Sequence, residues 1–135
     1  MAEVWMIRGN KQQHIWSHRA RYRGSHMLDG IRVIEMATYI AAPGAGGIMA
    51  DWGADVVKVE PLHGCPMRQF PSNIGSEGLQ GNPVFTIDKR GKKGVALDTS
   101  KPEGVAALKK LVVDADVFLT NVRPGGLERS GLDYE

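Results

Sequence analysis

Residues 30–60, GIRVIEMATYIAAPGAGGIMADWGADVVKVE, have the order of a strand, a loop, a helix and a second strand. The run Ile31 to Met36 is short and largely apolar, which is typical of a buried parallel strand. Pro43 suits the first turn of a helix, where its missing N–H costs nothing, and Gly53 suits a left-handed residue after the helix end. A β-branched run at 56–59 then forms the second strand, so the stretch predicts a βαβ unit.

The βαβ unit also predicts where a ligand would lie. In open parallel sheets, ligands bind beyond the carboxyl ends of the strands. That rule points to the loop Ala37–Ala42, after the first strand, and to Glu60–Gly64, after the second.

The middle of the chain is rich in glycine and proline. Leu62 to Pro83 predicts a long loop, and Val84–Ile87 predicts a short strand or a helical turn. Asp88–Gly94 predicts a basic, hairpin-like turn, and Val95–Asp98 predicts a strand.

The last third repeats the alternation of helix and strand. Ser100-Lys101-Pro102-Glu103 is a capping box, and it predicts a helix that continues to Val113. A buried strand at Asp116–Thr120 and a short helix at Leu127–Arg129 follow. The predicted fold class is α/β, a Rossmann-like parallel sheet with helices on both faces.

Charge and composition divide the 135 residues into two parts. Residues 1–27 hold five basic side chains against Glu3 and end in Gly24-Ser25-His26-Met27, so we interpret them as expression-tag sequence and 28–135 as the domain. The alternative is a basic arm that binds nucleic acid. No apolar run has the length of a membrane span, and a single cysteine, Cys65, forms no disulfide framework. We expect a cytoplasmic protein without nucleic acid, membrane or metal partners.

A partial nucleotide motif lies in the first helix. Gly44 and Gly46 begin a dinucleotide fingerprint, but its third glycine would fall at Met49. Glu60 stands where an acidic ribose ligand would lie in a nicotinamide-dependent dehydrogenase. Close packing of the helix on the strand by small residues is the favoured interpretation, and the dehydrogenase remains an alternative.

Two other clusters could bind anions. Lys89, Arg90, Lys92 and Lys93 could bind phosphates, or could form a solvated turn. Asn121 and Arg123 follow a strand and precede a helix, where they could recognise an anion or amide, or act as a cap and a surface charge. His63 and Cys65 are interpreted as bystanders, because no nucleophile–base pair is evident.

Several blocks, in this order, resemble the opening of the class III CoA-transferases (the CaiB/BaiF family), which includes formyl-CoA transferase, 2-hydroxyacid CoA-transferases and α-methylacyl-CoA racemase. The blocks are Leu28–Glu35, Ala41–Pro43, Asp51–Pro61, Lys92–Asp98, Lys101–Gly104 and Ala115–Gly125. The sequence departs from the family at Pro61-Leu62, where relatives often have a basic residue, and at Lys89-Arg90-Gly91.

The resemblance implies that residues 28–135 are the N-terminal part of a Rossmann-like domain that holds coenzyme A. The CoA contacts that it implies are Thr38, Tyr39, Ile40, Ala41, Lys92, Lys93, Asn121, Val122, Arg123 and Arg129. It implies transfer of CoA between an acyl thioester and a small carboxylic acid, with an acyl-CoA racemase as the alternative, and an interlocked homodimer.

In the family, an aspartate beyond the matched region forms the covalent intermediates, and Glu135 comes too early to correspond to it. The sequence therefore predicts a CoA-binding part of an enzyme, and we expect this chain to be inactive on its own. A binding module without activity is a further alternative.

Overall fold

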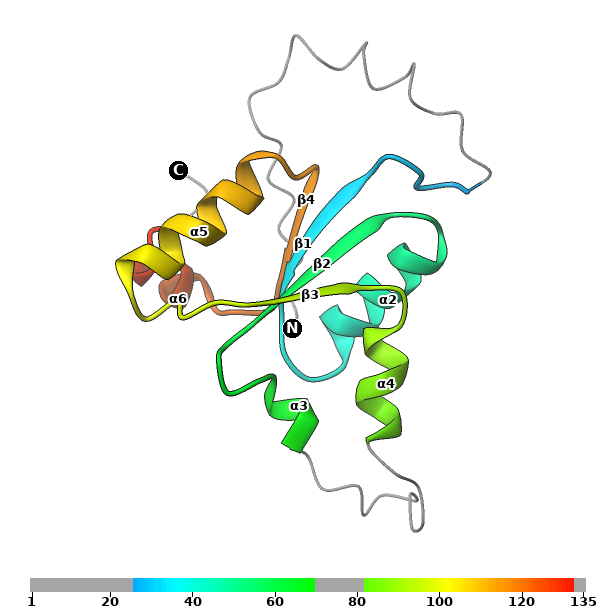
Figure 1. Cartoon of the computed structure of the whole chain (residues 1–135), viewed down its shortest axis with the longest axis horizontal. Coiled ribbons are helices and arrows are strands. Elements are labelled where there is room, and N and C mark those ends of the chain that lie inside the picture. Colours follow the sequence, from blue (N-terminus) through cyan, green and yellow to red (C-terminus); the bar gives the residue numbers. More distant parts are fainter. Residues whose placement is uncertain (1–25, 70–81, 133–135) are drawn as a thin grey trace, which may run out of the picture.

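The computed structural model describes residues 26–69 and 82–132. Four strands and five helices alternate along these residues (Figure 1). The strands are β1 (Arg32–Met36), β2 (Asp55–Glu60), β3 (Lys93–Ala96) and β4 (Val117–Thr120). The helices are α2 (Ala41–Asp51), α3 (Pro66–Gln69), α4 (Pro83–Lys89), α5 (Pro102–Val113) and α6 (Pro124–Arg129).

The four strands form one parallel sheet in the order β3-β2-β1-β4. Ile34 of β1 pairs with Val57 of β2 on one side and with Phe118 of β4 on the other. The predicted α/β class with a parallel sheet is therefore confirmed.

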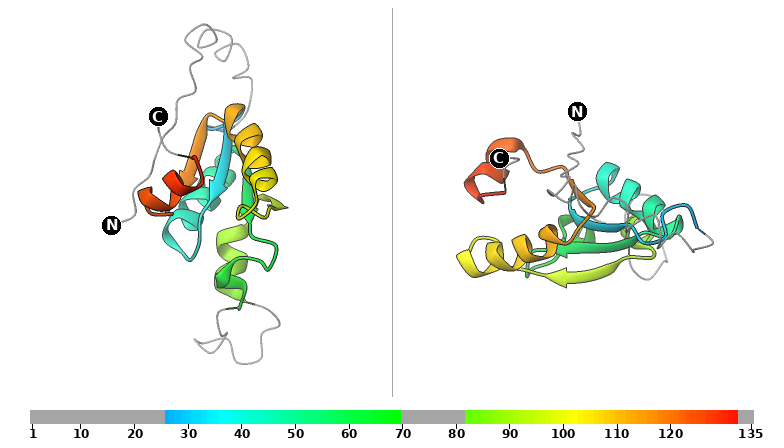
Figure 2. Two further views of the ribbon diagram at one scale, coloured as in Figure 1. Left: turned by 90° about the vertical axis from the view of Figure 1, so that its left-hand side faces the viewer. Right: turned by 90° about the horizontal axis from the view of Figure 1, so that it is seen from above.

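Helices cover both faces of this sheet. Val33 joins an apolar cluster under α2 that includes Ala42 and Val56. The next residue, Ile34, joins a different cluster that includes Leu108 of α5 and Phe118. Because successive side chains of a strand point to opposite faces, α2 and α5 lie on opposite sides of the sheet (Figure 2).

The strand order defines a switch point between β1 and β4. From β1 the chain adds β2 and then β3 on one side, and it returns through α5 to add β4 on the other side. In open α/β sheets, the crevice at such a reversal, beyond the carboxyl ends of the strands, is where ligands bind.

The first predicted unit agrees with the structure. Pro43 lies in the first turn of α2, and α2 ends at Asp51 with Trp52 as its C-cap. Gly53 follows with a φ of 95°, the left-handed conformation that glycine adopts without strain.

The capping box was a wrong prediction, because the N-cap of α5 is Lys101 and its side chain makes no capping hydrogen bond. Ser100 lies one residue earlier, and both its N–H (3.2 Å) and its hydroxyl (2.5 Å) donate to Oδ1 of Asp98. Ser100 therefore bonds within the local turn at Asp98 and does not cap the helix, as the sequence pattern had predicted it would.

The predicted hairpin-like turn was also wrong. Asp88 and Lys89 belong to the last turn of α4, and Lys93 begins β3, which is parallel to β2. The predicted long loop contains α3 and the start of α4, and residues 70–81 of it lie outside the described part. Residues 1–25 of the predicted tag also lie outside it.

Candidate functional site

The β1–α2 loop and the end of β4 meet at the switch point. Oδ1 of Asn121 accepts the Thr38 N–H at 3.0 Å, and its Nδ2 donates to the Thr38 carbonyl at 2.8 Å. One residue earlier, the hydroxyl of Thr120 donates to the carbonyl of Met36 at 2.8 Å. Side chains thus continue the pairing of the two strands beyond the sheet.

The loop presents an exposed surface next to the start of α2. Tyr39 is 55% exposed and has a φ of 62°, and Ile40 is 56% exposed. No acidic residue lies in the first turn of α2, and its N-cap, Ile40, makes no side-chain capping hydrogen bond. The first amides of a helix without such partners carry partial positive charge and suit an anionic ligand.

A buried carboxylate holds two lysines beneath this loop. Oε1 of Glu35 accepts from Nζ of Lys58 at 2.6 Å, and Oε2 accepts from Nζ of Lys92 at 2.5 Å. All three side chains are almost fully buried. We call these residues the Glu35 cluster.

The Glu35 cluster also binds the backbone at both ends of the loop. Lys58 donates to the carbonyl of Ala37 at 2.9 Å, and Lys92 donates to the carbonyl of Pro43 at 2.6 Å. Burial lowers the pKa of Lys92, while its hydrogen bond to Glu35 acts in the opposite direction. Each buried ammonium therefore has both a charged and a neutral acceptor, which offsets part of the cost of burying it.

The glycines of α2 allow the helix to approach these charges. A Cβ at Gly46 would overlap Oε2 of Glu35 and would lie 3.0 Å from Nζ of Lys92. A Cβ at Gly47 would lie 2.9 Å from Nη1 of Arg90. Gly46 therefore packs closely on β1, as the small-residue interpretation predicts, whereas Gly47 packs against Arg90 at the end of α4.

A second carboxyl lies near the Glu35 cluster. Asp88 is 8% exposed, and its Oδ2 is buried without a hydrogen-bond partner among the described residues. Burial raises the pKa of Asp88, although Lys92, Arg90 and Lys58 act to lower it. The group is therefore easier to protonate than an ordinary aspartate.

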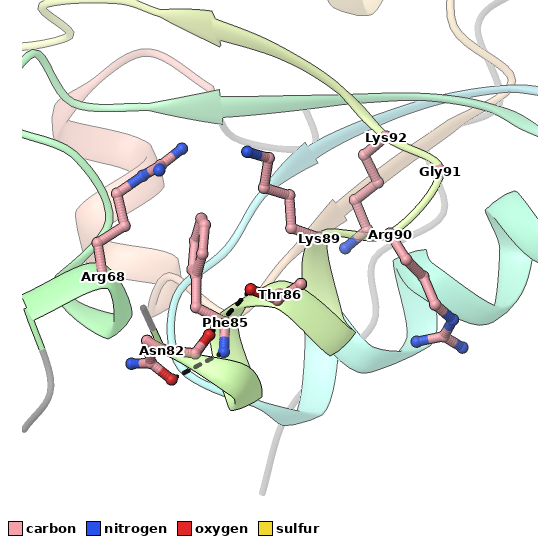
Figure 3. Close-up of a pocket in the computed structure, with 8 residues that line it drawn as sticks. All are labelled: Arg68, Asn82, Phe85, Thr86, Lys89, Arg90, Gly91 and Lys92. Carbon is pink, nitrogen blue, oxygen red and sulfur yellow. Dashed lines mark hydrogen bonds between the residues drawn. The ribbon is translucent and has the colours of Figure 1, made fainter. Parts of the chain in front are cut away.

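A basic groove of about 580 Å³ opens beside α4 (Figure 3). The ring of Phe85 stands between two cations, with the guanidinium carbon of Arg68 at 4.2 Å and Nζ of Lys89 at 5.7 Å from its centroid. Arg90 points away from the ring and pairs with Asp51 at 2.7 Å. Arg68 and Lys89 are therefore the cations that this groove offers beside an aromatic face.

Arg68 is fixed by the end of β2. Its Nε and Nη2 donate to the carboxylate of Glu60 at 2.7 and 2.9 Å. This hydrogen bonding lowers the pKa of Glu60, and the backbone N–H of Cys65 also donates to Glu60 at 3.0 Å. Glu60, the acidic residue predicted to bind a ribose, therefore binds Arg68 of the groove instead.

The structure separates the two lysines that the sequence grouped together. Lys92 is buried in the Glu35 cluster, whereas Lys93 is exposed at the start of β3 and pairs with Asp55 at 2.7 Å. Asp55 begins β2, so Lys93 lies toward the amino ends of the strands, away from the switch point.

The remaining candidates follow β4. Val122 is half-buried, and Arg123 is exposed as the N-cap of α6. Arg129 is exposed in the last turn of α6, and its guanidinium lies 3.8 Å from where a Cβ of Gly125 would be. Arg129 therefore folds back over the start of its own helix.

Sequence reasoning missed the Glu35 cluster and the groove pair, Arg68 and Phe85. Glu35 was taken as one residue of a largely apolar strand, and Lys58 was not singled out. The available signal was a charge inside each of two buried strands, since Glu35 and Lys58 are register partners. Cys65 is buried in a cluster with Phe85, in keeping with the bystander interpretation.

Two kinds of feature are absent from the described residues. Within residues 26–69 and 82–132, no group of three histidine, cysteine or acidic side chains could hold a metal ion. Nor does any helix in these ranges have the length and apolarity needed to span a membrane.

Comparisons with known proteins point to one family. The family model described as CoA-transferase family III matches residues 28–135. (R)-2-hydroxy-4-methylpentanoate CoA-transferase from Clostridioides difficile is 39% identical over 110 residues, which are 81% of this chain and 28% of that protein. Succinate–glutarate CoA-transferase from Agrobacterium fabrum is 42% identical over 113 residues, which are 80% of this chain and 28% of that protein.

A solved structure gives the same result. The CaiB/BaiF family protein from Brucella suis superposes with a TM-score of 0.72 at 38% identity, over 81% of this chain and 29% of that one. The chain therefore spans less than a third of the length of the relatives it matches.

Proposed function

The chain belongs to CoA-transferase family III, and from this premise we propose that residues 28–135 are the N-terminal part of its CoA-binding domain. The complete protein would transfer CoA between an acyl thioester and a free carboxylic acid. The two relatives described above are named for a hydroxy acid and for a dicarboxylic acid, so the shared chemistry of the acceptor is a carboxylate.

One observation carries the proposal in this chain. Asn121 and Thr38 join the ends of β4 and β1 through two hydrogen bonds, next to the uncapped start of α2. This geometry gives the switch point an exposed loop, Thr38–Ala41, and the exposed guanidinium of Arg123. Coenzyme A, an anion with phosphate groups and an adenine ring, has the chemistry that such a loop and such cations would bind.

The groove beside α4 extends the proposed site. Phosphates of CoA would be attracted by Lys89, whereas the charge of Arg68 is balanced by its pair with Glu60 and would contribute less. Lys92 would act indirectly, because its ammonium is engaged by Glu35 and Pro43. Arg129 and Lys93 are proposed only as contributors to the positive field around the ligand.

The covalent step is assigned by resemblance to an aspartate outside the matched residues. In that route the carboxylate would attack the acyl thioester, which forms a mixed anhydride and releases the CoA thiolate; the thiolate would then attack the enzyme carbonyl, which forms an enzyme–CoA thioester and releases the donor acid. The acceptor carboxylate would attack this thioester to form a second anhydride, and the released CoA thiolate would attack its acyl carbonyl, which yields the new acyl-CoA and restores the enzyme carboxylate. The part described here would bind and orient CoA. An interlocked homodimer is proposed for the complete protein.

The racemase of the same family remains the alternative activity, and it would use the same CoA site. The transferase is favoured because both relatives compared above are named as CoA-transferases. The dehydrogenase interpretation has lost its support, since Gly46 and Gly47 pack against Glu35 and Arg90 and Glu60 holds Arg68.

Calorimetric titration of this chain with CoA, and separately with NAD, tests the proposed site. We expect saturable binding of CoA that weakens in Arg123→Ala and Lys89→Ala, and no binding of NAD. The control is Val113→Ala, an exposed residue at the far end of α5, which should bind CoA as the wild type does. Binding of NAD without CoA would overturn the proposal.

The transfer itself is tested in the complete protein. A mixture of an acyl-CoA and a second carboxylic acid should yield the exchanged thioester and the released acid in equal amounts. Inversion of the acyl α-carbon without exchange would favour the racemase instead.

A further inference from the structure

We propose that Asn121 is a positioning residue, which holds the β1–α2 loop in its left-handed conformation at Tyr39 instead of acting as a ligand contact. The loop's importance for CoA rests on the proposed function, whereas its conformation does not. The two parts of the inference can therefore be tested separately.

The side-chain amide of Asn121 pairs with both polar groups of the Thr38 backbone. Its carbonyl oxygen faces the N–H of Thr38, and its amide nitrogen faces the carbonyl of the same residue. A flipped amide would place donor against donor and acceptor against acceptor, so the pairing fixes the orientation of the side chain. Both polar atoms are thus engaged with the backbone of the residue directly before Tyr39.

Tyr39 needs such support. It is the only non-glycine residue with positive φ among residues 26–69 and 82–132. A tyrosine is strained in this conformation, because its Cβ approaches the neighbouring carbonyl oxygen. The residue is 55% exposed, so burial does not hold its backbone in this conformation.

Contacts on both sides of Tyr39 place the restraint at Thr38. Before it, Lys58 binds the carbonyl of Ala37, and after it, the N–H of Gly44 donates to the carbonyl of Ile40 at 2.6 Å. These contacts fix where the loop leaves β1 and where α2 begins. Asn121 binds the peptide units between them, and without it the chain from Thr38 to Ile40 could relax to a conformation that tyrosine prefers.

The consequence for the site is preorganisation. A loop held in one conformation before the ligand arrives loses less conformational entropy on binding. Removing Asn121 should therefore weaken CoA binding even though its polar atoms face Thr38.

A double-mutant cycle on this chain tests the restraint without any ligand. Tyr39→Gly should raise the melting temperature by about 4 °C or more in the wild-type background, because glycine adopts positive φ without strain. In the Asn121→Ala background the same change should give less than half of that gain, since the strain has already been released. Tyr39→Ala is the matched control, because it removes the ring but keeps the Cβ, and it should not raise the melting temperature in either background.

Equal gains from Tyr39→Gly in both backgrounds would overturn the inference. Asn121→Asp provides a second background if Asn121→Ala does not fold, because it keeps the size of the side chain and sets a carboxylate oxygen, in place of the donor, against the carbonyl of Thr38. A cycle in that background is judged by the same criterion.

Titration with CoA adds the second part of the test. Asn121→Ala should weaken CoA binding at least tenfold at a temperature where the variant is folded. Unchanged affinity in Asn121→Ala, with a non-additive cycle, would overturn the link to the ligand and leave the restraint standing. Absence of CoA binding in the wild type would count against the proposed function, and the cycle would still decide the restraint.

Discussion

The two faces of the sheet differ in the polarity of the side chains that they bury. On the α5 face, Ile34, Leu108 and Phe118 form a wholly apolar cluster. On the α2 face, Val33 is followed two residues later by Glu35, which brings two buried lysines with it. These three charges lie where α2 and its preceding loop cross the carboxyl ends of the strands. The difference shows that the α5 face stabilises the domain, while the α2 face also fixes the backbone at the candidate site.

The largest expected effect comes from removing the charge at the centre of the Glu35 cluster. Glu35→Gln keeps the shape but leaves two buried ammoniums without a carboxylate, which should cost about 3–5 kcal/mol of unfolding free energy. Ile34→Val, the neighbour on the apolar face, should cost only about 0.5–1.5 kcal/mol. Urea unfolding of both variants makes the comparison, and equal losses would contradict it.

Cavity formation on the apolar face should affect stability alone. Leu108→Ala removes a side chain with no exposed surface and should cost about 2–5 kcal/mol. Under conditions where it remains folded, its affinity for CoA should equal that of the wild type, as measured by calorimetry. Loss of affinity in the folded variant would show that the two faces are not separable.

Crowding of the charged face should have a moderate effect. Gly46→Ala places a methyl group against Glu35 and Lys92 and should cost about 1–3 kcal/mol. The matched control is Gly94→Ala in β3, where a Cβ would meet nothing within 4 Å. Equal thermal stability of the two variants would mean that α2 can move away from the cluster.

The smallest effect should depend on pH. Burial raises the pKa of Asp88 above its unfolded value, so its charge opposes folding at neutral pH and this cost disappears as the pH falls through its folded pKa. Asp88→Asn should therefore raise the midpoint of urea unfolding at pH 7, and the gain should shrink toward pH 4. A gain that grows as the pH falls would contradict this sign.

The parts of the fold that were predictable depend on local patterns. The β1–α2–β2 unit and the α5–β4–α6 segment each contain apolar periods, prolines and glycines that mark their own boundaries. The rule for parallel sheets points to the loop Ala37–Ala42 as the ligand edge, whereas the contact of Thr38 with Asn121 was not predicted.

The parts that were missed depend on partners distant in sequence. Lys92 lies 57 positions from Glu35, and nothing around Lys92 shows that it is buried. Its neighbours Arg90 and Lys93 are charged and partly or fully exposed, so the segment has the pattern of a solvated turn. The groove pair was missed because Arg68 and Phe85 lie in the segment that glycine and proline marked as loop.

The Glu35–Lys58 pair has a consequence for how the chain finds its register. Opposite β1, Lys58 is paired with Glu35, and a slip of β2 by one residue would turn the lysine to the other face. There it would face the buried apolar side chains of Ile34 and Phe118 and lose its partner Glu35. Burying an unpaired ammonium among apolar side chains costs far more free energy than the loss of apolar contacts. The single Glu35–Lys58 pair therefore selects the native alignment of β2 against β1.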